Sequence, residues 1–392
     1  MEKRCRMDGS EKRAQYGRGK RMMIRVILGV VLLMGMAALV LFLLILNSSK
    51  GELTPFYDEE GNVLQGGISE RVYLEINGVK NGMIIRGRNA EQPVLLFLSG
   101  GPGVPQYWLN EYYDNRLEDY FTVCWWDTPG EGISYDATLD PQDISIDRLE
   151  EDAVVVTEYL KERFGQDKIY LMAHSGGTPF ALDLVRKHPE LYHCYFAMGQ
   201  VINPEVAGSR YTAGYHFMKP ILEQKGDKRT LSKMEALVTV EEDGTVTPKD
   251  PETIGAKWES ILLASGCATT REMRNDATGI FFPVMFAKCY TFPEKIHFWQ
   301  GKGLYGKSAY KQVEHELNLE AEFEIPIYFI NGYYDYTCPT SLVEAYYERV
   351  KAPDKDILIL KDSAHSPLWE ENERVLSFMR EKAGRYETTS HS

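Results

Sequence analysis

The sequence contains few cysteines, and their spacing suits neither a zinc site nor a complete set of disulfides. Only 6 of the 392 residues are cysteines, and five of them follow the long apolar run near the amino end, an odd number that cannot all pair within one chain. Cys124 and Cys194 lie in strand-like runs, where a thiol behaves as a small core residue. A disulfide between Cys267 and Cys289 is conceivable. We expect no metal and no cofactor.

Features of nucleotide and nucleic-acid binding are also missing. The chain carries a net charge of −13 at pH 7, and its acidic part has no basic stripe, so phosphate backbones would be repelled. The glycine-rich segment Ser99–Gly103 is not followed by the Gly-Lys-Ser/Thr of a phosphate loop. Internal repeats and low-complexity tracts are absent as well. We therefore expect no nucleic-acid partner.

Long apolar runs are absent apart from one, Val26–Leu46. Its 21 uncharged residues would span a hydrocarbon core of about 30 Å as a helix that rises about 1.5 Å per residue. Nine basic and three acidic side chains precede it, and this net charge of +6 holds residues 1–25 in the cytoplasm. We predict an uncleaved, single-pass signal anchor at residues 26–46 in the cell membrane, with the rest of the chain outside. A cleaved signal peptide is the alternative, although Leu46–Lys50 offers no Ala-x-Ala site.

A lone serine, Ser175, lies where a strand is expected to turn into a helix. Lys168–Ala173 is a short apolar run typical of a buried parallel strand, and Thr178–Lys187 is predicted to be helical. A serine on such a tight elbow exposes its hydroxyl, and the N–H groups after it can bind an oxyanion at the helix N-terminus. Ala173 takes the place of the first glycine of the usual motif. The alternative is an ordinary glycine-rich turn.

The partners that such a serine needs follow it in the order Asp, then His. Asp335 comes after the strand-like run Ile325–Gly332, and His365 comes after Asp356–Leu360. The carboxyl ends of parallel strands meet at the edge of a sheet where ligands bind, and this order suits a Ser-Asp-His triad. A turn-capping aspartate and a surface histidine are the alternatives.

Two loops upstream also follow predicted strands. Pro93–Leu98 leads into Ser99–Gly103, which either aims a backbone N–H at the carbonyl oxygen that the serine attacks or is a simple turn. Phe121–Trp126 leads into the second loop, Asp127–Ser134.

These motifs, in this order, resemble the α/β-hydrolase superfamily and, within it, the proline iminopeptidase-like branch. That branch carries a His-Gly-Gly-Pro-Gly loop, a Trp-Asp-Gln-Arg-Gly-x-Gly-x-Ser stretch and a Gly-x-Ser-x-Gly elbow, which are matched by Gly100–Gly103, Trp126–Ser134 and Ser175–Gly177. Ser99 replaces the loop histidine and Thr128-Pro129 replace Gln-Arg, but these departures remove no catalytic group. The resemblance covers roughly residues 70 to 385.

The resemblance implies an α/β-hydrolase fold and a role for each matching residue. Ser175 is the implied nucleophile, His365 its base and Asp335 the group that orients the base. The backbone N–H groups of Gly101 and Gly176 are the implied oxyanion donors.

The chain around these motifs alternates predicted strands and helices, which implies a mostly parallel sheet with helices on both faces. A hairpin is expected at Val72–Arg86 around an Asn-Gly turn. Asp147–Phe164 is predicted to be a helix that is capped by Asp147 with Glu150 and that ends at Gly165.

After a linker at residues 47–70, one hydrolase domain is expected at residues 71–385, with an inserted helical lid at about 203–322. The insertion is rich in aromatic residues, which suit a lid over an apolar pocket or merely pack the lid onto the core: Tyr211, Tyr215, Phe217, Phe281, Phe282, Phe286, Tyr290, Phe292, Phe298 and Trp299. Three acidic residues of the insertion would bind a cationic substrate group or be solvated surface charges: Glu205, Glu241 and Glu242.

Two classes of function compete. The first is a membrane-anchored serine hydrolase that cleaves an amide or ester of a small molecule or short peptide through an acyl-enzyme. Within it an aminopeptidase leads a carboxylesterase or lipase, because the loop motif resembles that of the iminopeptidases. The second is a non-catalytic binding protein of the same fold, which the retention of every expected catalytic group disfavours.

Overall fold

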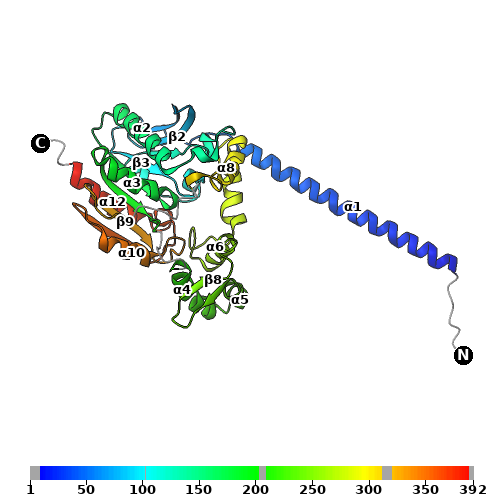
Figure 1. Cartoon of the computed structure of the whole chain (residues 1–392). Helices are drawn as coiled ribbons and strands as arrows, with labels where there is room; N and C mark the ends of the chain where they lie inside the picture. Colours follow the sequence, from blue (N-terminus) through cyan, green and yellow to red (C-terminus); the bar gives the residue numbers. More distant parts are fainter. Residues whose placement is uncertain (1–8, 102, 203–208, 311–319, 388–392) are drawn as a thin grey trace.

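The protein is described by a computed structural model that covers residues 9–101, 103–202, 209–310 and 320–387 (Figure 1). Pro102 of the predicted oxyanion loop and Glu205 of the predicted lid lie outside the described residues.

An eight-stranded sheet forms the centre of the molecule, with the strand order β1-β2-β4-β3-β5-β6-β9-β10. Strand β2 runs antiparallel to both β1 and β4, and the other neighbouring strands are parallel. The predicted hairpin is therefore the β1–β2 pair, and the rest is the predicted parallel sheet. The strands are β1 (Ile68–Ile76), β2 (Val79–Gly87), β3 (Val94–Leu98), β4 (Thr122–Asp127), β5 (Ile169–His174), β6 (Tyr192–Met198), β9 (Ile327–Gly332) and β10 (Lys355–Leu360).

Helices cover both faces of this sheet. Along the fully buried β3, Leu95 and Phe97 belong to one hydrophobic cluster and Leu96 and Leu98 to the other, because successive side chains of a strand point to opposite faces. The first cluster includes side chains of α12, and the second includes side chains of α2, α3 and α10. The bounds are α2 (Ile146–Phe164), α3 (Thr178–Lys187), α10 (Thr340–Arg349), α11 (Pro367–Glu370) and α12 (Asn372–Glu387).

The two ends of α2 can be compared with the predicted N-terminal cap at Asp147 and the predicted C-terminal end at Gly165. The predicted cap is wrong, because the side chain of Ser145 accepts the hydrogen bond of the Arg148 N–H at 3.2 Å. The carboxylate of Glu150 instead pairs with Lys187 at 2.6 Å. The predicted stop is confirmed, since Gly165 takes a left-handed conformation with φ of 64°.

Between β6 and β9 the chain leaves the sheet and forms a mainly helical insertion. Figure 1 shows α4, α5 and α6 as a lobe beside the sheet, with α8 next to the end of α1. Cys267 and Cys289 are both buried and free, so the conceivable disulfide is not formed. The elements are α4 (Ser209–Lys225), α5 (Lys228–Leu237), the ribbon of β7 (Val238–Val240) and β8 (Val246–Pro248), α6 (Ile254–Ser265), a π-helical turn (Ala277–Phe281), α7 (Phe282–Phe286) and α8 (Phe292–Tyr305).

The amino-terminal helix α1 (Gly9–Ser48) stands away from the rest of the molecule (Figure 1). Within the described residues one helical stretch, Met22–Ser48, is long and apolar enough to cross a membrane. It contains the whole of the predicted run Val26–Leu46.

Candidate active site

Ser175 lies on a sharp turn between β5 and α3. It has φ of 48°, a left-handed conformation that is uncommon for a residue other than glycine. The turn passes so close to the loop after β3 that side chains larger than glycine would not fit beside Ser175. A Cβ at Gly177 would lie 2.6 Å from the carbonyl oxygen of Ser99, and a Cβ at Gly100 would lie 2.9 Å from Cβ of Ser175. The elbow expected from the sequence is therefore present, and these glycines make it possible.

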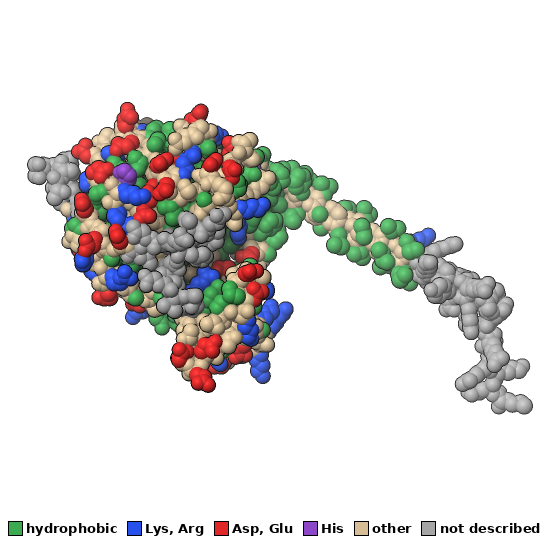
Figure 2. Space-filling model, viewed as in Figure 1, with side chains coloured by type: hydrophobic (Ala, Val, Ile, Leu, Met, Phe, Trp, Pro, Cys, Tyr) green, Lys and Arg blue, Asp and Glu red, His purple; other side chains and the backbone are tan. Residues whose placement is uncertain are grey.

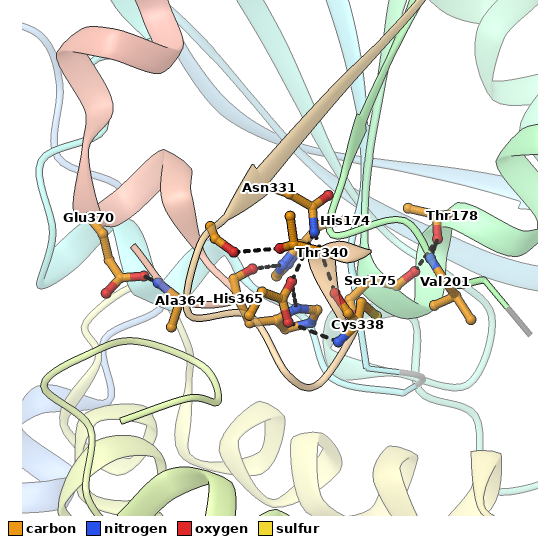
Figure 3. Close-up of polar contacts among 12 residues, drawn as sticks. His174, Ser175, Thr178, Val201, Asn331, Cys338, Thr340, Ala364, His365 and Glu370 are labelled. Carbon is orange, nitrogen blue, oxygen red and sulfur yellow. Dashed lines mark hydrogen bonds and ion pairs between the residues drawn. The ribbon is translucent and has the colours of Figure 1, made fainter. Parts of the chain in front are cut away.

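Asp335 and His365 lie on the loops after β9 and β10, and the structure brings them together (Figure 3). His365 Nδ1 is 2.8 Å from Asp335 Oδ2, and because the carboxylate is an acceptor, the imidazole donates this bond. The backbone N–H of Cys338 donates to the other oxygen, Oδ1, at 2.8 Å. Asp335 is fully buried and held from two sides, which fixes the orientation of the ring.

The electrostatic surroundings of His365 favour a protonatable base. Burial opposes a charge on its ring, but the negative charge and the hydrogen bond of Asp335 outweigh burial, so the pKa of His365 is raised. The other ring nitrogen, Nε2, is buried and has no hydrogen-bond partner among the described residues. In enzymes, the hydrogen bond between a general base and the group that it deprotonates often tightens only when substrate is bound. Nε2 is thus available to accept a proton.

His174, directly before the serine, connects three loops of the site. The Gly100 N–H donates to Gln106 Oε1 at 2.8 Å, and Gln106 Nε2 lies 2.7 Å from His174 Nδ1. His174 Nε2 lies 2.6 Å from the carbonyl oxygen of His365, so Nε2 must carry the proton and Nδ1 must accept. Burial, and then the charge of His365, lower the pKa of His174 well below its usual value. A neutral imidazole therefore ties the glycine-rich loop, the elbow and the His365 loop together.

The predicted oxyanion donors belong to the same neighbourhood. Gly101 has φ of 140°, a conformation that favours glycine, and it follows the Gly100 amide that is fixed by Gln106. Gly176 lies in the turn Ser175–Gly177 that leads into α3, where the first N–H groups of a helix have no partner within it. Their role in binding an oxyanion stays a prediction.

The second glycine-rich loop, after β4, is a buried hydrogen-bonded turn. Asp127 Oδ2 accepts from the Ile133 N–H at 2.9 Å, and Glu131 Oε1 accepts from the Thr128 N–H at 2.9 Å. Burial raises the pKa of Asp127 to about 7, and burial with the charge of Asp127 raises the pKa of Glu131. These contacts give the motif a structural role, because they stabilise the loop that packs against α8 at Gly130.

The base of the lid is bonded to both loops that carry the histidine and the aspartate. The carbonyl oxygens of Cys267 and Ala268 accept from the N–H groups of Tyr336 and His365, each at 3.1 Å. The carboxylate of Glu370 accepts from the Arg271 N–H at 2.5 Å and from Ala364 at 2.8 Å. Burial raises the pKa of Glu370 to about 7. Lid and site therefore form one packed unit.

One lid carboxylate that sequence reasoning missed acts on the site. Glu259 of α6 is partly buried, and this burial raises its pKa, while the charge of His365 lowers it and the charge of Asp335 raises it. Its signal in the sequence is an acid within the otherwise apolar stretch of α6 around Trp258 and Ile261. Glu241 and Glu242, by contrast, are exposed on the turn between β7 and β8.

Comparisons with known proteins find the following similarities. A sequence profile described as alpha/beta hydrolase fold matches residues 93–215. A probable aminopeptidase of Bacillus subtilis is 28% identical over 311 residues, which cover 76% of this chain and 91% of that protein. A proline iminopeptidase of Saccharolobus solfataricus is 25% identical over 315 residues, which cover 76% of this chain and 86% of that protein. Among solved structures, a 2-hydroxy-6-oxo-6-phenylhexa-2,4-dienoate hydrolase from Rhodococcus aligns with a TM-score of 0.48 and 16% identity, covering 81% of this chain and 99% of that one.

Proposed function

Because this chain belongs to the α/β-hydrolase superfamily, we propose that it is a membrane-anchored serine hydrolase that cleaves an amide or ester bond. The observation that carries the proposal is the buried pair of His365 and Asp335, joined at 2.8 Å, with Nε2 of the imidazole unpaired among the residues that the structure describes. A neutral buried imidazole in this arrangement is what a general base requires. Ser175 on the strained elbow is the nucleophile of the proposal.

The reaction proceeds in two halves. His365 Nε2 takes the proton of the Ser175 hydroxyl while the oxygen attacks the substrate carbonyl, and the backbone N–H groups of Gly101 and Gly176 bind the resulting oxyanion. Asp335 keeps Nδ1 protonated and stabilises the imidazolium. The imidazolium then protonates the leaving group, and water attacks the acyl-enzyme with the same histidine as base. No cofactor is needed for these steps.

An aminopeptidase of small or short-peptide substrates is the preferred activity. Two curated relatives carry the names of aminopeptidases, and such enzymes must hold a protonated α-amino group close to the attacked carbonyl. Glu259 supports this activity because it places a carboxylate within electrostatic reach of His365 and Asp335. A carboxylesterase or lipase is the second candidate, which the aromatic lid beside an apolar helix supports.

Substrate pairs that differ only in the free amine test this choice. The full-length protein should hydrolyse aminoacyl arylamides faster than their N-acetylated forms. Glu259→Gln should lower kcat/KM for the free-amine substrate by about 10- to 100-fold, the worth of a charge-assisted hydrogen bond of roughly 1.5–3 kcal/mol. At a pH well above the pKa of His365, where the charge of Glu259 no longer alters the protonation of the base, the rate for short-chain nitrophenyl esters should be unaffected.

Glu241→Gln, on the exposed β7–β8 turn, is the matched control and should change neither rate. Hydrolysis of the esters alone, with no effect of Glu259→Gln, would replace the aminopeptidase by the esterase. Hydrolysis of neither class by wild type, with Ser175 unreactive, would favour the non-catalytic binding protein.

The apolar helix is the proposed anchor. The length and apolarity of Met22–Ser48 support a membrane span, and the basic residues before it support a cytoplasmic amino end. The hydrolase domain then lies outside the cell.

A further inference from the structure

The carboxyl end of α1 is fastened to the domain without a flexible spacer. Lys295 of α8 is fully buried, and its Nζ donates to the hydroxyl oxygens of Ser48 and Ser49 at 3.0 and 2.9 Å and to the Met285 carbonyl at 2.8 Å. Lys50 forms a β-bridge with Thr291. Any membrane that α1 crosses therefore has the domain directly on its surface.

Contacts between α1 and the domain also form inside the apolar run, before its end at Leu46. Phe42 packs edge-on against Phe292 of α8, with ring centroids 5.6 Å apart, and Ile45 is buried against the domain. Phe42 lies four residues inside the run that ends at Leu46, which is about 6 Å along the helix axis. Phe292 is therefore at the depth at which interfacial helices bury their apolar side, about 5–10 Å.

A stripe of apolar side chains extends from this point along α8. Phe292, Ile296 and Trp299 follow one another at positions i, i+4 and i+7, which share one face of a helix. Trp299 meets Phe281, with centroids 5.5 Å apart, and Phe281 meets Phe282 at 5.4 Å. Ile296, Phe281 and Phe282 are 38%, 41% and 36% exposed, an unusual exposure for neighbouring large apolar side chains. We call these five residues the α8 stripe.

We propose that the α8 stripe lies in the boundary between headgroups and acyl chains of the bilayer that α1 spans. The inference rests on the anchor proposed above. The stripe is continuous with the packed contact of Phe42, and Figure 2 shows the hydrophobic surface of α1 running up to the body of the protein. Aromatic side chains are enriched at this depth of a membrane. The exposed cations Lys50 and Lys288 lie beside the junction, where anionic headgroups attract them.

The contact fixes where the active site lies relative to the lipid. A Cβ at Gly103 of the oxyanion loop would lie 2.8 Å from the Gly301 carbonyl oxygen and from the Tyr305 ring of α8. Gly301 follows Lys295 by six residues, about 9 Å along the helix. Helix α8 thus links the membrane junction directly to the loop beside Ser175.

Environment-sensitive probes on the full-length protein test the contact. A nitrobenzoxadiazole label is attached at Phe282→Cys or Ile296→Cys in a Cys5→Ser background, since the other five cysteines are buried. Val155→Cys, at an exposed position of α2, is the matched control, and Leu33→Cys reports on α1 itself. The protein is reconstituted in vesicles of phosphatidylcholine and phosphatidylglycerol with doxyl-labelled lipid.

The probes at positions 282 and 296 should show blue-shifted emission, quenching by doxyl lipid and loss of iodide quenching, whereas the probe at 155 should show the reverse. Iodide quenching at 282 and 296 as strong as at 155, with position 33 in lipid, would overturn the α8 contact and leave the anchor standing. Protection from iodide without lipid quenching would mean that a second protein surface covers the stripe, which also overturns the proposal. An aqueous probe at 33 would refute anchor and contact together, while labelling of Ser175 by a fluorophosphonate reports separately on the hydrolase.

Discussion

The proposed role of the Asp335 carboxylate rests on its hydrogen bond with His365. This carboxylate is the partner of His365 Nδ1, whereas the alternative acid next to the histidine, Asp362, is exposed to solvent. Asp335→Asn should therefore preserve folding and lower kcat by about 10⁴, because the imidazole loses its tautomer and its counter-charge. Steady-state kinetics measure the change in kcat, and thermal unfolding shows whether the variant is folded. Asp362→Asn is the control and should stay close to wild type; the opposite order would reassign the acid.

The pH dependence of the same site follows from the pKa of His365. Because Asp335 raises this pKa above 6.5, kcat/KM should fall on the acid side with a midpoint above pH 6.5, where the imidazolium can no longer accept the serine proton. In Asp335→Asn the charge and the hydrogen bond of Asp335 are lost, while burial still lowers the pKa of His365 and the smaller effects of Glu259 and Glu370 still raise it. The residual activity of that variant should therefore have its acid limb at lower pH. An unmoved or higher midpoint in a pH series of kcat/KM would contradict this.

At the scale of elements, the elbow depends on a close approach of two backbones. Gly177 has φ of −82°, which alanine can adopt, but an added Cβ would lie 2.6 and 2.8 Å from the carbonyl oxygens of Ser99 and Leu98. Gly177→Ala should displace Ser175 and lower kcat/KM by about 10²-fold, the cost of a misplacement of about 1 Å. Steady-state kinetics on a soluble ester or arylamide measure it.

Gly165→Ala at the end of α2 is the matched control for that variant. It has φ of 64° and no atom within 4 Å of an added Cβ, so it should lose about 1–2 kcal/mol of stability from backbone strain and no activity. Equal kinetics for the two variants would show that the elbow tolerates a methyl group at Gly177.

Helices and strands whose apolar residues follow a clear local pattern could be predicted from the sequence. The apolar runs of β3, β5 and β9, the helix α3 and the apolar run of α1 follow from local patterns, and strand order along the chain placed Ser175, Asp335 and His365 at one sheet edge. What could not be predicted depends on contacts between distant segments.

The roles of His174 and Glu259 depend on such contacts between distant segments. His174 acquires its part only because Gln106 and the His365 carbonyl converge on its two nitrogens. Glu259 looks like an ordinary acid in the sequence, and only the fold brings it within electrostatic reach of His365 and Asp335. The predicted cap of α2 is wrong for a simpler reason: both Ser145 and Asp147 are good N-cap residues, and the helix begins after Ser145, two residues before Asp147.

For the whole molecule, the charge asymmetry and α1 together predict the topology. Protease added to intact cells or protoplasts should degrade the region after residue 50, because the net charge of +6 before the apolar run keeps the amino end inside. Immunoblotting with tags at each end measures this, with lysed cells as the control. Full protection of the domain in intact cells but not after lysis would reverse the orientation.

The central claim is that the chain is a hydrolase whose nucleophile is Ser175, and covalent labelling tests it most directly. An active-site-directed fluorophosphonate should label the full-length wild type and should fail to label Ser175→Ala, with His365→Ala labelled far more slowly because the base is lost. The melting temperatures of the three proteins show whether they are folded. Equal labelling of wild type and Ser175→Ala, or no labelling of the folded wild type, would contradict the account.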